Sequence, residues 1–286
     1  MDQNSGLLYI IRLLIQKKKQ FIIVGIISSI AGIALAFLLP VYYKSTCIFY
    51  PYSPKAYDPR YMFSNVDVDL FGTGDDADRV ITIGNSSLIS NYIIEKYNLI
   101  DRYNIDRGSN YFYIKATEKF RDNYKISEDD RSAITVTIFD KDPDTAAIIA
   151  NDIVNQIDYY NRKPLIESNA KQLDKFKTDL QTKYSRLDSL SKSDASQKQL
   201  NNSEKDMLSI TMINTYSDLK EAETRLSILE EDFQTLYIIE KAAPVIKKAR
   251  PVRWLVVSIT IVGTLLVYLI GLVLVDQYRS SVGKEL

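Results

Sequence analysis

Two long apolar runs without a single charge lie near the two ends of this 286-residue chain. The first extends from Phe21 to Leu39 and the second from Trp254 to Val275. At ~1.5 Å per residue, either run as a helix can cross the ~30 Å hydrocarbon core of a bilayer. Buried helices of soluble proteins are usually shorter and seldom apolar on every side. We therefore predict transmembrane helices at 21–39 and 254–275.

The first run also shares features with a secretory signal peptide. Three lysines, Lys17 to Lys19, precede it, and Ala34 and Ala36 form an Ala-x-Ala pattern. In a signal peptide, however, that pattern follows the apolar run, whereas here it lies inside the run. We expect the segment to be retained as a membrane helix.

Basic residues around the first run predict the orientation of the chain. Arg12 and Lys17 to Lys19 precede the run, whereas only Lys44 follows it closely. Because basic flanks favour the cytoplasmic side, residues 1–20 are predicted to be a cytoplasmic tail. A second crossing would return residues 276–286 to the cytoplasm and leave 40–253 on the other side.

A basic segment directly precedes the second apolar run. Its residues would lie at the outer lipid headgroups, which is acceptable because long loops translocate largely regardless of charge. Two roles remain open: anchoring to membrane lipid headgroups, or binding an anionic lipid or a lipid-diphosphate-linked glycan. The candidate residues of this stem are Pro244, Lys247, Lys248, Arg250, Pro251 and Arg253.

The composition argues against several classes of function. The chain has no histidine, which removes His-based acid–base and nucleophile systems and most zinc sites. Lys plus Arg equals Asp plus Glu, at 36 each, so no global field favours nucleic acid. The single cysteine, Cys47, excludes an intrachain disulfide. We expect a packed thiol there, with a redox or intermolecular role as the alternative, and we expect no enzyme, cofactor or metal.

The sequence that follows the first apolar run predicts an α/β base. Strands are predicted at 43–50, 132–140 and 236–242, with a short one possible near 124–126, and a helix at 86–100. The Tyr- and Pro-rich stretch 50–61 is predicted to be a loop packed on the sheet, with stacking on sugar rings as the alternative. Carboxylates surround the "FGTG" motif, and we expect a solvated loop with Asp76 or Asp78 capping the next helix rather than a cation site: Asp67, Asp69, Asp75, Asp76 and Asp78.

A helical arm follows the base. Asp142 and Pro143 are a typical N-cap and first helical residue, and Pro164 predicts a kink or break near 160–164. The polar stretch 189–206 is predicted to be a turn. After it, apolar residues alternate in spacing of four and three, which indicates a coiled-coil seam packing back on the first helix. The seam residues are Leu208, Met212, Leu219, Leu226, Leu229 and Phe233.

The predicted fold class is therefore an α+β membrane protein, with two transmembrane helices bracketing an α/β base and a long antiparallel helical hairpin. The base comprises 40–142 and 236–253, and the arm comprises 143–235. An isolated hairpin is possible, but we favour arms that pack on copies of themselves, because apolar residues remain off the seam. Small residues in the membrane helices would allow close packing with each other or with a partner: Gly25, Gly32, Gly263 and Gly271.

In this order, the elements resemble the Wzz-type chain-length determinants, or polysaccharide co-polymerases. The resemblance covers nearly the whole chain and is carried by "LLPVYY", "SSLISNYIIEKYNL", "DKDPDTAAIIANDIVN" and "AAPVIKKARP". It implies a periplasmic base and arm in an inner-membrane homo-oligomeric ring that works with a Wzy-type polymerase, with lipid-linked polysaccharide as a possible further partner. It also implies non-catalytic control of O-antigen, capsule or exopolysaccharide length. The arm looks shorter than in many members, and the proline segment is sparse.

Other classes of protein fit the sequence less well. A transmembrane sensor or a fused kinase would need more than the short tail expected after 275. A helical-hairpin adaptor of a secretion system, or an export component that couples polymerisation to secretion, remains the alternative. Such adaptors usually carry more β-structure than is visible here.

Overall fold

The structure is a computed structural model, and it describes residues 10, 13–53, 69–192, 198–231 and 233–282. The chain divides into two compact units. One holds the chain up to Lys44, Phe139–Pro143 and the chain from Val245 onward. The other holds Ser45–Ile138 and Asp144–Pro244.

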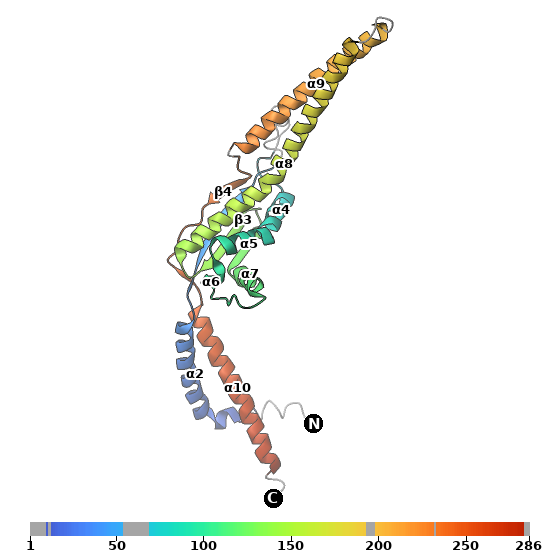
Figure 1. The fold of residues 1–286 in the computed structure, drawn as a ribbon. Coiled ribbons are helices and arrows are strands. Elements are labelled where there is room, and N and C mark those ends of the chain that lie inside the picture. The colour runs from blue at the N-terminus through green and yellow to red at the C-terminus, as the bar shows by residue number, and fades with distance from the viewer. Residues whose placement is uncertain (1–9, 11–12, 54–68, 193–197, 232, 283–286) are drawn as a thin grey trace. The chain divides into compact units, whose positions relative to one another are not determined.

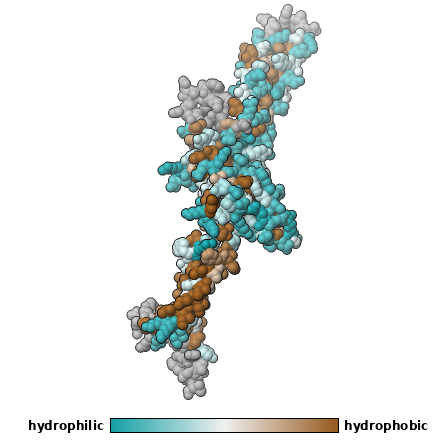
Figure 2. All heavy atoms as spheres, turned by 90° about the vertical axis from the view of Figure 1, so that its left-hand side faces the viewer, coloured by the Kyte–Doolittle hydropathy of each residue, from teal (hydrophilic) through white to brown (hydrophobic). Residues whose placement is uncertain are grey.

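The first unit is built on two apolar helices. Helix α2 spans Lys18–Leu38 and α10 spans Arg253–Val282. Both are long and apolar enough to cross a membrane, and little of either apolar stretch is buried within the protein. Figure 2 shows their hydrophobic side chains on the molecular surface. An apolar surface of this extent is costly in water, which agrees with the two membrane helices expected from the sequence.

A five-stranded sheet forms the framework of the base. Its strands are β1 Tyr42–Pro51, β2 Tyr124–Glu128, β3 Ile134–Asp140, β4 Leu236–Glu240 and β5 Lys248–Arg250. The order is β2-β3-β1-β4, and β5 pairs with the start of β1. The β1–β4 and β2–β3 pairs are antiparallel. The predicted strands are present. Strand β5 was missed because its three residues, two of them basic, show no alternation of apolar and polar side chains.

Four short helices of the second unit contribute to the core of the base, together with the first part of helix α8, which spans Pro143–Ser191. The short helices are α4 Gly74–Gly84, α5 Ser87–Lys96, α6 Leu99–Arg102 and α7 Phe112–Asn123 (Figure 1). In β1 the burial alternates, so that Cys47 and Phe49 are fully buried in this core. Burial also raises the pKa of the Cys47 thiol. The residue therefore packs as a small apolar group, as expected.

One local expectation for the base was wrong, and another was confirmed only in its helix cap. The helix expected over 86–100 is interrupted at Asn98, which adopts φ 48°, so that α5 and α6 are separate. Asp69 lies outside any helix or strand, whereas Asp75, Asp76 and Asp78 lie in the expected next helix, α4. Thr73 and Asp76 form a reciprocal capping box at its start, and Asp76 is thus a cap. Asp67 and residues 54–61 of the Tyr/Pro-rich stretch lie outside the described residues.

The arm is a hairpin of two long helices (Figure 1). Helix α8 spans Pro143–Ser191, with 49 residues, and α9 spans Lys198–Glu230, with 33. Pro143 is the first helical residue, as predicted. The prediction near Pro164 was a kink or a break. A break is wrong, because the helix continues through this exposed proline, where solvent can reach the backbone. The turn is also shorter than 189–206, because helix extends into both ends of that stretch.

Candidate functional site

Helices α2 and α10 approach each other closely along one line. Ser28, Gly32 and Ala36 are the buried residues of α2 and are spaced by four. A Cβ at Gly32 would lie 3.2 Å from the Cβ of Thr260 and 3.3 Å from the Cα of Val257. Small residues at every fourth position permit this approach. Gly32 therefore has a packing role within the pair, and Ser28 and Ala36, which the sequence analysis did not select, share it.

The other three candidate glycines lie away from this line. A Cβ at Gly25, Gly263 or Gly271 would have no atom within 4 Å. They do not pack the two helices together, so their contact with a partner stays a prediction. In the sequence, a spacing of four residues from Gly32 could have distinguished the small residues of α2 that pack against α10 from those that do not.

Aromatic rings hold two of the four basic residues of the stem. The guanidinium of Arg250 lies 3.7 Å from the ring centroid of Phe139, and that of Arg253 lies 4.3 Å from the ring centroid of Phe37. These are cation–π contacts, which fix the arginine side chains near the start of α10. Lys247 and Lys248 are exposed.

Strand β5 sets the backbone of the stem. Arg250 is paired with Tyr42 and Lys248 with Tyr43, and the Arg250–Pro251 peptide bond is cis. Pro244 is exposed and Pro251 is half-buried. The stem therefore combines two arginines engaged with rings and two lysines open to solvent. A role toward lipid or glycan stays a prediction.

The chain between β4 and the stem is fastened to the base. The Asn151 side chain on α8 donates to the carbonyl of Ala242 and accepts from its N–H, both at 2.9 Å. The Ser45 hydroxyl donates to the carbonyl of Ala243 at 2.8 Å. This pairing satisfies both backbone groups of Ala242 and gives Asn151, in the "DKDPDTAAIIANDIVN" motif, a definite structural task.

Polar side chains of α8 hold the root of the arm. The Asp158 carboxylate accepts from the Thr235 N–H at 2.6 Å and from its hydroxyl at 2.7 Å. The Asn161 amide donates to the same hydroxyl at 3.0 Å, and Arg162 donates to the carbonyl of Phe233 at 3.0 Å. Thr235 is fully buried. These bonds fix the segment between α9 and β4.

The same network reaches α4 and the residue that follows β1. Arg79 donates from Nε to the Asn161 side-chain oxygen at 3.0 Å and forms an ion pair with Asp76 at 2.9 Å. The N–H of Tyr52 donates to the carbonyl of Thr235 at 2.9 Å. The arm root is thereby tied to a helix and a strand of the base. Sequence reasoning missed this cluster; its only signal was the run of polar residues after the apolar face of α8.

A second cluster fixes α5 to α8. The Lys96 ammonium lies 2.8 Å from Oδ2 of Asp152, and its hydrogen bond to this carboxylate is the main reason that the pKa of Lys96 is raised. The Tyr97 hydroxyl donates to the same Oδ2 at 3.2 Å. Burial, followed by the neighbouring Asp152 charge, raises the pKa of Tyr97 to about 12. The lysine is exposed, so the cluster orients helices more than it stabilises them.

Five of the six predicted seam residues lie on α9, and Phe233 is the exception. Met212, Leu219 and Leu229 are buried, and Leu208 and Leu226 are half-buried. Leu219 and Leu226 pack against α8, in a cluster with Leu173, Phe176 and Leu180. Phe233 follows the end of α9, and its carbonyl is part of the arm root instead.

Comparisons with known proteins give similarity at the level of structure. No protein-family model matches the chain, and no curated protein matches it. The chain is similar to a full-length bacterial polysaccharide co-polymerase. This pair has 11% identity and a TM-score of 0.44, and the match covers 94% of this chain and 98% of the other.

A fragment of WzzB, a polysaccharide co-polymerase from Salmonella Typhimurium, has 13% identity and a TM-score of 0.41, with 73% of this chain and 100% of that one covered. A point mutant of the Shigella flexneri O-antigen chain-length regulator WzzBSF has 9% identity and a TM-score of 0.29, over the same shares of the two chains. Identities and TM-scores this low establish no common activity.

Proposed function

We propose that this protein is a non-catalytic regulator of surface polysaccharide chain length. The polymer would be an O-antigen, a capsule or an exopolysaccharide, and the protein would act as a scaffold beside a Wzy-type polymerase. The observation that carries the proposal is the architecture: two apolar helices near the chain ends bracket a base whose hydrogen-bonded root holds a long helical hairpin. It agrees with the family resemblance found in the sequence.

The proposed location is the inner membrane of a bacterium. Helices α2 and α10 would cross the bilayer, both termini would be cytoplasmic, and the base and arm would be periplasmic. The distribution of Lys and Arg around the first helix supports this orientation. Exposed Trp254, next to the first residue of α10, is of the type that lies at a membrane interface.

Self-association is a further part of the proposal. Met207, Ile210 and Ile213 on α9 are more than half exposed, at 66%, 61% and 69%. Apolar side chains of this size are costly in water, and neighbouring copies of the arm would cover them. At ~1.5 Å per residue, the 33 residues of α9 offer about 50 Å of helix for such contacts.

Deletion of the gene in its own organism tests the proposal. The surface polysaccharide is run on a silver-stained gel, and a plasmid copy of the gene serves as the control. We expect polymer to be made but to lose its preferred length, and the plasmid copy to restore it. Complete loss of polymer would favour an export component. An unchanged ladder, in a genome without a related gene, would contradict the proposal and favour an adaptor of another secretion system.

A further inference from the structure

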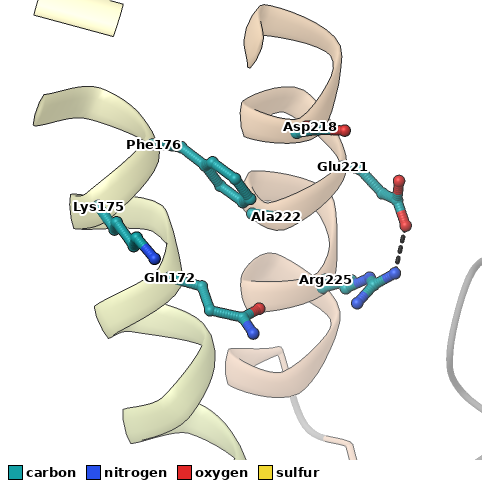
Figure 3. A pocket seen from close by; sticks show the side chains of 7 residues that line it. All are labelled: Gln172, Lys175, Phe176, Asp218, Glu221, Ala222 and Arg225. Carbon is teal, nitrogen blue, oxygen red and sulfur yellow. Dashed lines mark hydrogen bonds and ion pairs between the residues drawn. The ribbon is translucent and has the colours of Figure 1, made fainter. Parts of the chain in front are cut away.

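The arm carries a groove that the proposed scaffold function does not explain. It lies between α8 and α9 and has a volume of about 460 Å³, which is in the range of small-molecule sites. Figure 3 shows its side chains extending from both helices around the small residue Ala222. The lining residues are Gln172, Lys175, Phe176, Asp218, Glu221, Ala222 and Arg225.

The groove combines one ring with several planar polar groups. Phe176 is half-buried and extends toward Ala222, which gives the groove an apolar wall (Figure 3). Around it stand the Gln172 amide, the Asp218 and Glu221 carboxylates and the Arg225 guanidinium. Glu221 and Arg225 form an ion pair, which holds both groups in place along the groove. Donors and acceptors are thus both present.

The balance of charge in the groove narrows the class of ligand. Among the described residues that line it, two cations, Lys175 and Arg225, are matched by two anions, Asp218 and Glu221. Because these charges cancel, the groove offers no net attraction to a phosphate or an acidic polymer, nor to a metal ion. A purely apolar ligand would strip water from polar groups without replacing their hydrogen bonds.

Uncharged sugar rings meet these requirements. Their hydroxyls donate and accept, so they can pair with amide, carboxylate and guanidinium groups alike. Their C–H faces can pack against an aromatic ring. We propose that the groove binds a short uncharged segment of the polysaccharide, with Gln172 and Asp218 as hydrogen-bonding residues and Phe176 as the apolar wall. This inference rests on the proposed function, because it identifies the ligand of the same protein's arm.

Binding to the full-length protein in detergent micelles tests the proposal. The ligand is the surface polysaccharide of the source organism, freed of lipid, cut to short oligosaccharides and separated so that its uncharged segments are used. Alginate oligosaccharides are the acidic comparison. Affinity is measured by isothermal titration calorimetry, and saturation-transfer NMR identifies the sugar protons in contact.

The variant to test is Gln172→Ala with Asp218→Ala, two exposed positions. The matched control is Gln181→Ala with Asp174→Ala, which are exposed on α8 and outside the groove. We expect about tenfold weaker binding in the groove variant, for two hydrogen bonds lost, and wild-type binding in the control. Circular dichroism checks that both variants keep their helices.

Three results would overturn the groove as a glycan site: no binding of the uncharged segments to wild type, equal binding by the two variants, or preference for alginate. The deletion experiment separates this outcome from failure of the proposed function. A lost preferred length without binding in the groove would retain the regulator and reject the site. An unchanged ladder would reject the proposed regulatory function. The binding result would then decide only whether the groove binds sugar.

Discussion

At the residue scale, one carboxylate at the arm root binds two groups of the same residue. Asp158 accepts from the N–H and the hydroxyl of fully buried Thr235. Asp158→Ala leaves these donors without their acceptor and should lower the free energy of unfolding by about 1–3 kcal/mol. Urea unfolding of the full chain in detergent, followed by circular dichroism, measures the loss. Asp174→Ala, at an exposed position of the same helix, should change little; equal losses would contradict the assignment.

Tyr124 gives a prediction for alkaline pH. It is buried, its hydroxyl donates to the carbonyl of Gly84 at 2.9 Å, and burial raises its pKa above the ordinary value of about 10. Above pH ~10 the unfolded chain loses this proton while the folded chain keeps it. The stabilisation from Tyr124 is therefore complete below pH ~10 and declines as the pH rises further.

Tyr124→Phe should thus lower stability by roughly 1 kcal/mol at neutral pH and make the alkaline decline shallower. Some decline should remain, because burial also raises the pKa of Tyr97. Unfolding free energies at several pH values between neutral and strongly alkaline give the slope. The control, Tyr111→Phe, alters a side chain that is 65% exposed and should keep the wild-type slope. A slope unchanged in Tyr124→Phe would refute the linkage.

At the scale of elements, helix α9 of the arm has one face that packs in the seam and another that is exposed. Leu219 is 7% exposed and packs in the seam, whereas Ile213 is 69% exposed. Leu219→Ala should destabilise the hairpin by about 2 kcal/mol or more, because it leaves a cavity between the helices. Ile213→Ala should leave unfolding nearly unchanged but weaken self-association. Thermal melting and light scattering in detergent separate the two effects, and the reverse pattern would reject the assignment of sides.

Periodicity decided how well each element could be predicted. The 4–3 spacing around Leu219 spans several turns, so the hairpin could be read directly from the sequence. Helices α4 and α7 are short and rich in charge, and only their tertiary contacts make them stable. Pro164 favoured a break by local propensity, but packing on both sides of it keeps α8 continuous. The arm root was beyond prediction, since Asp158 and Thr235 meet only after folding.

At the scale of the whole molecule, the sequence indicated two apolar helices but could not say which small residues lie between them. Only Gly32 among the four candidate glycines has close neighbours on the partner helix. Gly25, earlier on the same helix α2, has open space around it. The two glycines therefore form a matched pair for asking whether function depends on packing between α2 and α10.

Gly32→Leu should force α2 and α10 apart, because even a Cβ would lie 3.2 Å from Thr260. If the proposed scaffold depends on this pair, the polysaccharide should lose its preferred length although the protein is still made. Gly25→Leu adds the same side chain where there is room and should keep the preferred length. Silver-stained gels, with immunoblots for protein level, compare the two strains. A normal ladder from Gly32→Leu would mean that base and arm act without precise packing of the helix pair. Loss in Gly25→Leu alone would instead place the important contact on the open side of α2.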